Sequence, residues 1–150
     1  MNELLEILIA HLNSLKKALA WLNDSFRKCR YYDKILEYTN DEFSDLEALS
    51  ARFSRTLDIL TQKVYRSFDL IEYAESGTLI DAVNHAEKRG ILNSGNLIRD
   101  MKNIRNQIAH EYLEEALRDI FIAVIKLTPD LITYCDIAIV YSEKLQTQDK

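Results

Sequence analysis

Apolar residues recur along most of the chain at steps of three and four, the spacing that places them on one face of an α-helix. The first stripe occupies Leu5, Leu8, Leu12, Leu15, Leu19, Leu22 and Phe26. It weakens in the stretch CRYYDKILEYTN, where the first helix is expected to end. A period close to 3.5 residues favours small crossing angles of about +20° between neighbouring helices.

A second stripe predicts a long helix that begins near Thr39. Thr39 and Glu42 have the spacing of a capping box, in which each residue satisfies a free N–H of the other. The apolar positions of this helix are Leu46, Leu49, Phe53, Leu57, Leu60, Val64, Phe68 and Ile71. The helix is expected to end near Gly77, with this glycine in the left-handed conformation that follows a helix end.

Shorter helices are expected in the second half of the chain. One begins at Thr78 and stops at Lys88, because Arg89 and Gly90 have the chemistry of a helix end. The next opens near Asn93 or Ser94, and its apolar positions are Ile98, Met101, Ile104 and Ile108.

The last third of the chain predicts one or two further helices. A stripe covers Leu117, Ile120, Phe121, Val124 and Leu127. Thr128 and Pro129 are interpreted as the cap and first-turn proline of a final helix, with a kinked continuation as the alternative. That final segment carries Leu131, Tyr134, Ile137, Tyr141 and Leu145.

No segment alternates strictly between apolar and polar residues, so the sequence predicts an all-α fold. Long helices with short connections indicate an up-and-down bundle of about five helices. We expect one domain over residues 1–150, with a polar C-terminal tail from about residue 146. A helix above 30 residues is long for so small a bundle, and we expect a symmetric homodimer.

Composition narrows the class of protein further. Three glycines and one proline in 150 residues exclude an all-β sandwich and a disordered chain. No apolar run is long enough for a membrane span, and the N-terminus lacks the basic flank of a secretory signal. Two cysteines are consistent with reduced thiols, so the expected location is the cytoplasm. The formal net charge of −5 argues against nucleic-acid binding by bulk electrostatics.

The segment RNQIAHEY, residues 105–112, is not explained by packing alone. On an ideal helix Arg105 falls on the apolar side, where a guanidinium needs an anionic or hydrogen-bonding partner. Asn106 and His110 share another face. Arg105 and His110 are roughly 140° apart and diverge, unless the helix breaks before His110 or a second copy completes the site.

These residue types suit the cleavage of RNA without a metal or another cofactor. A ribose 2′-hydroxyl attacks the adjacent phosphate, histidine transfers a proton and arginine offsets charge in the transition state. The three histidines of the chain are scattered and form no metal-binding pattern. On residue types alone, a capping or surface histidine is the commoner explanation.

The order Arg105, Asn106, His110, Tyr112 resembles the HEPN superfamily, and in particular the HepT toxins, whose partners are minimal nucleotidyltransferase antitoxins. The resemblance in length and helical character extends over most of the chain. It implies a dimeric ribonuclease with Arg105 and His110 as catalytic residues and Asn106 in support. It also implies Tyr112 as the residue to which the antitoxin adds AMP. A packed aromatic is an equally good interpretation of Tyr112.

Two alternatives and one auxiliary site remain open. The chain could be a non-catalytic helical partner, or substrate-binding subunit, of a small nucleotidyltransferase. It could also be a structural bundle whose motif serves only dimerisation. If RNA such as tRNA or mRNA is the substrate, Arg52 and Arg55 could line its path, although a solvated helix face is the more usual role of such residues.

Overall fold

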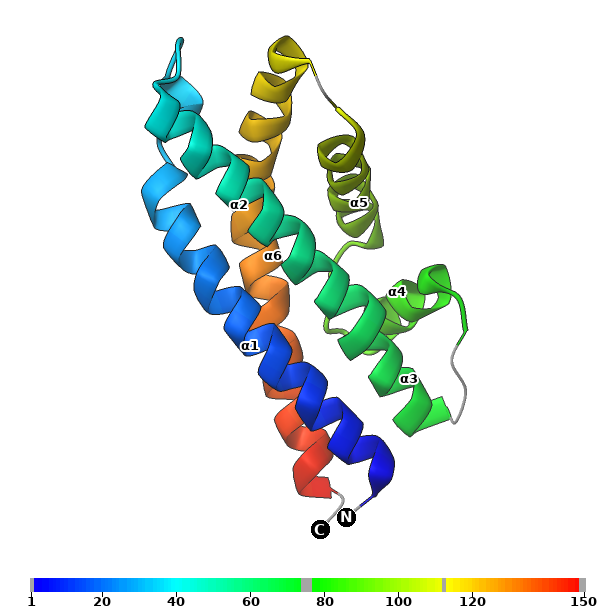
Figure 1. Ribbon diagram of the computed structural model, residues 1–150. Coiled ribbons are helices and arrows are strands. Elements are labelled where there is room, and N and C mark those ends of the chain that lie inside the picture. The colour runs from blue at the N-terminus through cyan, green and yellow to red at the C-terminus, as the bar shows by residue number, and fades with distance from the viewer. Residues whose placement is uncertain (1, 74–76, 112, 149–150) are drawn as a thin grey trace.

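A computed structural model describes residues 2–73, 77–111 and 113–148, and its described part contains helices and no strands (Figure 1). The all-α prediction with about five helices is therefore confirmed, counting the continuous rod α2–η2–α3 as one helix. The elements are α1 (Glu3–Cys29), the 3-10 turn η1 (Tyr32–Lys34), α2 (Asn40–Asp58), the π-helical segment η2 (Ile59–Val64), α3 (Tyr65–Tyr73), α4 (Leu79–Lys88), α5 (Gly95–His110) and α6 (Glu114–Gln148).

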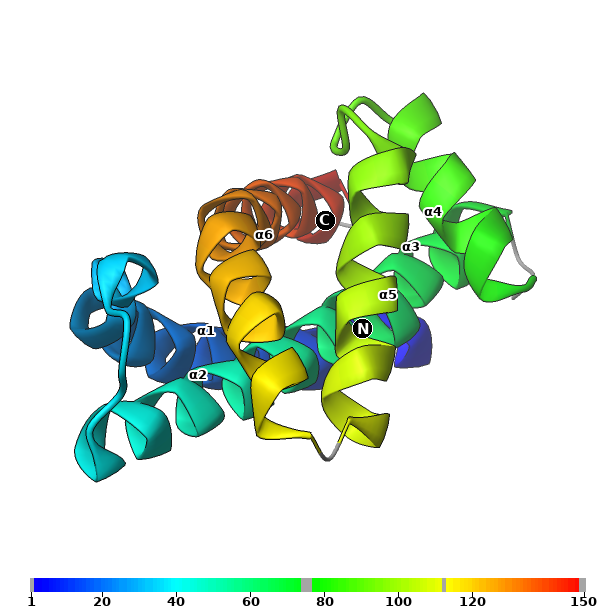
Figure 2. The same cartoon turned by 90° about the horizontal axis from the view of Figure 1, so that it is seen from above.

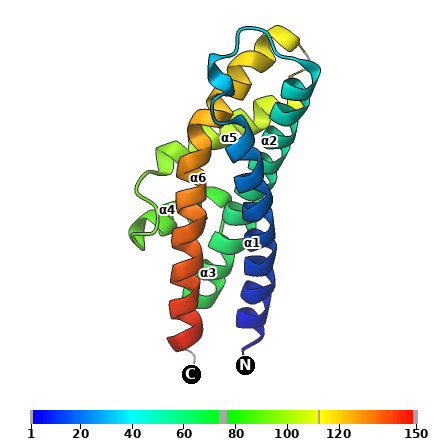
Figure 3. The same cartoon turned by 90° about the vertical axis from the view of Figure 1, so that its left-hand side faces the viewer.

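The long helices alternate in direction, as an up-and-down bundle requires. In Figure 1, α1 rises, α2–α3 descends beside it, α5 rises and α6 descends, while the short α4 lies across the lower half. Figure 3 shows that the start of α1 and the end of α6 lie close together at the bottom of the molecule. Packing of α2 against both α1 and α5 makes α2 the link between the N-terminal hairpin and the helix that carries the motif.

The predicted stripes form the core. All six leucines of the α1 stripe are buried, and Phe26 at its end is partly buried. They pack in one cluster with buried residues from α2, α5 and α6, among them Leu49, Phe53, Met101 and Val124. Burial of such a side chain contributes about 1.5–3 kcal/mol relative to exposure, so the stripes account for the arrangement of the helices.

The predicted helix ends depend on local capping and are mostly confirmed. The Thr39–Glu42 capping box is present, with N···O distances of 2.9 and 3.1 Å. Ser94 caps α5, and Gly90 has a φ of +78° after α4. The left-handed conformation expected of Gly77 is wrong, because Gly90 is the glycine with positive φ in the described chain. The polar tail expected from about residue 146 is helical as far as Gln148.

The second helix contains a π-helical segment that its apolar period did not predict. Leu60, Thr61 and Val64 are buried in this segment, and Tyr65 is buried directly after it. The segment begins directly after Asp58, the residue that Arg105 contacts.

Interpretation of Thr128 and Pro129 as the start of a new helix is wrong; α6 continues through both residues (Figure 3). Proline removes one helical hydrogen bond, which normally disfavours an interior position. Here the prolyl ring is exposed, while Val124, Thr128 and Leu131 on either side of it are buried. Core packing of both halves on one face therefore keeps the helix continuous, which is the alternative that the sequence left open.

Replacement of Tyr65 with phenylalanine is expected to leave stability unchanged or raise it by up to about 1 kcal/mol. The hydroxyl of this fully buried residue has no hydrogen-bond partner in the described part of the chain, and burial raises the pKa of Tyr65. Removal of an unsatisfied buried polar group at constant shape removes its desolvation cost. Urea unfolding midpoints measure the effect, and a loss of 2 kcal/mol or more would show that the hydroxyl is bonded in solution.

Candidate functional site

The helix that carries the motif is α5, which is short and capped at both ends. The Ser94 side chain accepts a hydrogen bond from the N–H of Leu97, which starts the helix. At the other end Glu111 is extended, with φ −90° and ψ 128°, and its N–H donates to the carbonyl of Gln107 at 2.8 Å. His110 is therefore the last residue of α5, directly before the connection to α6.

Arg105 pairs with Asp58 at the end of α2. Its Nε lies 3.2 and 3.3 Å from the two carboxylate oxygens, and its Nη2 lies 3.0 Å from Oδ2. The hydrogen bonds and charge of Asp58 raise the pKa of Arg105 above its ordinary value. The prediction that Arg105 needs an anionic or hydrogen-bonding partner is confirmed, and this partner is 47 residues away in the sequence.

About one third of each side chain in this pair remains exposed, 35% for Arg105 and 33% for Asp58. An exposed ion pair contributes little net stability, about 0–1 kcal/mol, because water solvates both charges well in its absence. A guanidinium that holds a carboxylate through two nitrogens can hold a phosphate in the same geometry. The pair is therefore a position at which a phosphate oxygen could take the place of Asp58.

His110 is exposed and does not meet Arg105 through a bend in α5. The helix is unbroken up to His110, so the expected alternative of a break before this residue is wrong. Five residues along a regular helix separate two side chains by roughly 140°, and the imidazole and guanidinium of one protomer diverge. Completion of the site by a second copy stays a prediction.

Asn106 lines a hollow of about 240 Å³ between α4 and α5. Its floor is apolar, with Leu79, Val83 and Ile98, and its rim carries Arg99 and Lys102 besides asparagines. Neither Arg105 nor His110 lines this hollow. Of the three predicted site residues, which all belong to α5, this hollow therefore includes only Asn106.

Tyr112, the expected site of AMP addition, lies outside the described residues. Arg52 and Arg55, the expected RNA contacts, differ from each other. Arg52 crosses to α1, where Nη1 lies 2.7 Å from the Ser25 hydroxyl and 3.2 Å from the Trp21 carbonyl oxygen. Arg55 is exposed on the face of α2 between Arg52 and Asp58.

Asp58 is the residue of this site that the sequence alone did not reveal. Its signal is visible in retrospect, because Asp58 is the single acidic residue in a stretch of α2, η2 and α3 that carries Arg52, Arg55, Lys63 and Arg66. A carboxylate that stands alone among basic residues is a candidate partner for a cation on another helix. The sequence does not say which helix supplies that cation.

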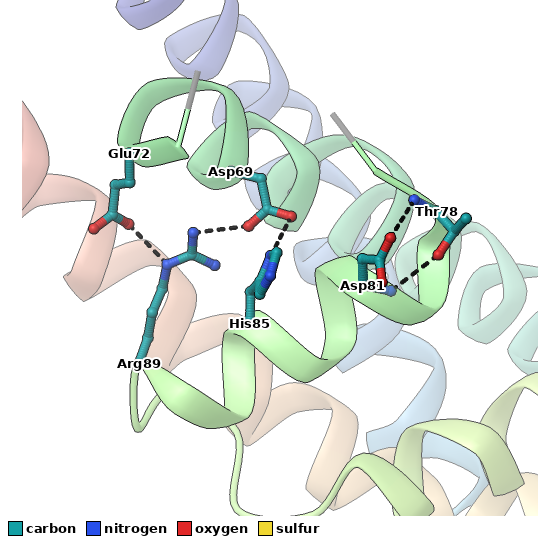
Figure 4. A network of polar contacts seen from close by, with 6 residues as sticks. All are labelled: Asp69, Glu72, Thr78, Asp81, His85 and Arg89. Carbon is teal, nitrogen blue, oxygen red and sulfur yellow. Dashed lines mark hydrogen bonds and ion pairs between the residues drawn. The ribbon is translucent and has the colours of Figure 1, made fainter. Parts of the chain in front are cut away.

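A second polar cluster joins α3 and α4 (Figure 4). The Asp69 carboxylate is 1% exposed, and it accepts from Arg89 Nη2 at 2.7 Å and contacts His85 Nδ1 at 3.0 Å. Arg89 also donates through Nε to Glu72 at 2.8 Å, and its side chain is 4% exposed. Because the acids of α3 are paired with basic residues of α4 and its C-terminal end, the cluster is best explained as a set of contacts that hold α4 against the bundle.

Comparison with known proteins adds no relative to this description, because no family model, curated protein or solved structure matches the chain significantly. Among the helices of the described residues, none has the length and apolar character that crossing a membrane requires.

Proposed function

We propose that this protein is a HEPN-type, metal-independent endoribonuclease, the toxin of a pair whose antitoxin is a small nucleotidyltransferase. One observation carries the proposal: in the motif RNQIAHEY, Arg105 is held in an exchangeable ion pair while His110 is exposed at the end of the same helix. The reaction requires a cation that binds the phosphate and a group that transfers a proton.

The chemistry assigns one task to each residue. His110 takes the proton of the ribose 2′-hydroxyl, and the 2′-oxygen attacks the adjacent phosphorus. A 2′,3′-cyclic phosphate forms as the bond to the 5′-oxygen breaks, and that oxygen leaves as a hydroxyl with the proton that His110 has taken up. Arg105 leaves Asp58 and binds the phosphate oxygens, whose negative charge grows in the transition state. Asn106 orients the RNA beside the reacting groups.

The site is completed in a symmetric homodimer. Arg105 and His110 diverge in one protomer, and a twofold axis near the ends of the two α5 helices brings the arginine of one copy toward the histidine of the other. Each dimer then has two equivalent sites. AMP added to Tyr112 by the antitoxin would place an anionic group two residues from His110 and compete with the RNA phosphate for Arg105.

The test is cleavage of tRNA and mRNA by the purified protein in the presence of a chelator. We expect products that end in a 2′,3′-cyclic phosphate, and no cleavage of a substrate with a 2′-deoxy sugar at the cut position. Cleavage of the deoxy substrate would contradict the mechanism. The ribonuclease proposal would be overturned if the protein cleaves no RNA although it is free of its antitoxin and its mass shows that Tyr112 carries no AMP.

A second candidate function is a non-catalytic partner of the nucleotidyltransferase. The net charge of −5 favours it, because association with free RNA gains nothing from the overall charge of the protein. Co-purification with a small nucleotidyltransferase, together with an inactive released chain, would favour this candidate over the ribonuclease.

Asp58→Asn is expected to strengthen RNA binding by up to about fivefold. The substitution removes the carboxylate that competes with phosphate for Arg105, and an exposed pair of this kind is worth about 0.2–1 kcal/mol. Fluorescence anisotropy of a labelled RNA measures the effect, and Asp130→Asn, at an exposed position of α6, is the control for net charge. Equal affinities for the two variants, or weaker binding by Asp58→Asn, would show that Asp58 does not occupy a phosphate position.

A further inference from the structure

Charge is unevenly distributed in this acidic protein. Residues 7–23 of α1 contain two lysines and no acidic residue. Residues 48–67, on the rod that packs against α1, contain four basic residues and only Asp58 as an acid. Asp58 is itself neutralised by Arg105. The chain has 24 acidic residues in total, and these two segments hold only one of them, so the middle of α1 and the part of the α2–η2–α3 rod in residues 48–67 form a locally basic region.

An exposed tryptophan lies at one end of this basic region, one turn before Asp24. Trp21 is the only tryptophan of the chain, and it is 55% exposed although it belongs to a helix with a well-packed core face. The guanidinium carbon of Arg52 lies 4.8 Å from the centroid of its ring. Hydrogen bonds to Ser25 and to the Trp21 carbonyl fix that guanidinium, so the aromatic and cationic groups are pre-organised.

Other basic residues continue the region on both helices. Lys17 lies one turn before Trp21 on α1 and is exposed. Lys63 belongs to η2, which packs against α1, and is exposed as well. Exposed cations therefore lie both on α1 and on the rod that packs against it.

Three residues of α2 lead from this tryptophan toward Arg105. Arg52, Arg55 and Asp58 follow one another at steps of three residues on α2, which move about 60° around the helix and about 4.5 Å along it. The first contacts Trp21, the second is exposed, and the third holds Arg105. Figure 2 shows α1 and α5 on different sides of α2, so a bound strand would pass around α2 to reach both.

We propose that Trp21 and Arg52 form a stacking site for a base of single-stranded RNA, whose backbone Arg55 guides toward Arg105. Aromatic rings beside a basic groove bind single strands with little dependence on sequence, because every base has a π face. The proposal rests on the proposed function for the cleavage step, but it concerns binding and names the class of substrate. It also explains how a protein of net charge −5 holds RNA, since binding uses a local basic surface.

The first experiment uses Trp21 as its own probe. A base stacked on the indole changes its fluorescence, and the chain has no other tryptophan to obscure the signal. The protein is titrated with single-stranded RNA and with a duplex of the same sequence, in the His110→Ala background so that the RNA stays intact. We expect quenching by the single strand and little by the duplex. Binding of RNA, seen by anisotropy of a label, without any change in Trp21 fluorescence would overturn the stacking site.

Variants test the energetic role of the ring. Trp21→Ala is expected to weaken binding of a labelled single strand by at least about fivefold, whereas Trp21→Phe retains most of the affinity. Tyr31→Ala is the matched control, because Tyr31 is 65% exposed and stacks with Arg30 at 4.6 Å. Tyr31 precedes the acidic stretch that begins at Asp33 and is not on the path. Equal losses for Trp21→Ala and Tyr31→Ala would contradict the proposal.

The backbone contact of Arg55 is tested through salt dependence. Arg55→Gln is expected to lower the slope of log affinity against log salt by about 0.7, the value for one phosphate contact with a single strand. Lys126→Gln, an exposed cation on α6, changes the charge equally and should leave the slope unchanged. An unchanged slope in Arg55→Gln would remove this residue from the path.

The outcomes separate this inference from the ribonuclease proposal. RNA binding through Trp21 without any cleavage by the wild type retains the stacking site and rejects the ribonuclease. Cleavage with equal kcat/KM in wild type and Trp21→Ala retains the ribonuclease and rejects the stacking site. If the basic surface instead binds an acidic protein, single-stranded RNA will neither quench Trp21 nor bind more tightly than a duplex.

Discussion

Replacement of His110 with alanine is expected to lower RNA cleavage by at least about a hundredfold and to leave the fold intact. Loss of a positioned group that transfers protons costs about 10²–10⁴ in rate. The imidazole is exposed at the last position of α5 and is not part of the core, so truncation removes little packing. Initial rates on a defined RNA in chelator, with circular dichroism of both proteins, measure the two effects.

Gln107→Ala is the matched control for that substitution. Gln107 is also exposed and lies in the last turn of α5, and its backbone carbonyl, which accepts from Glu111, is unchanged by the mutation. We expect its cleavage rate to stay within about twofold of the wild type, as a surface substitution does. Equal rates for His110→Ala and the wild type would remove His110 from the catalytic assignment.

Asp69→Ala is expected to destabilise the protein by about 3 kcal/mol, a fall of roughly 10 °C in melting temperature for a chain of this size. The substitution leaves the guanidinium of Arg89, 4% exposed, without the carboxylate that binds its Nη2. It also removes the contact to His85 Nδ1. Glu72 still binds Nε of Arg89, which limits the loss.

The exposed pair Asp24–Arg27 provides the comparison for Asp69. Both side chains are more than half exposed, so Asp24→Ala should cost less than about 1 kcal/mol. Chemical unfolding of both variants measures the difference. A loss below 1 kcal/mol for Asp69→Ala would mean that water replaces the carboxylate, and that the cluster does not fasten α4 to the bundle.

Local chemistry explains why most helix ends could be predicted. Capping depends on side chains three residues apart, as at Thr39 and Glu42, and this information lies in one short segment of sequence. The π-helical segment and Pro129 were missed because both are decided by the core. Residues on several helices determine which face is buried, and that packing overrides the local preferences of one or two residues.

The candidate site was predictable only in part, for a similar reason. A helical period placed Arg105 on the packed side and indicated that it needs a partner. The partner, Asp58, is brought to it by the packing of α2 against α5, which no local pattern encodes. Trp21 was not singled out by the sequence, because its importance depends on the neighbours that α2 supplies.

Mixing two inactive variants tests the central claim, that Arg105 of one copy and His110 of another act on the same phosphate. Arg105→Ala and His110→Ala are each inactive alone on this account. After exchange of subunits, a mixed dimer has one site with both residues intact, and an equimolar mixture should recover about a quarter of wild-type activity. No recovery in a mixture whose subunit exchange is verified by native mass spectrometry would contradict the shared site.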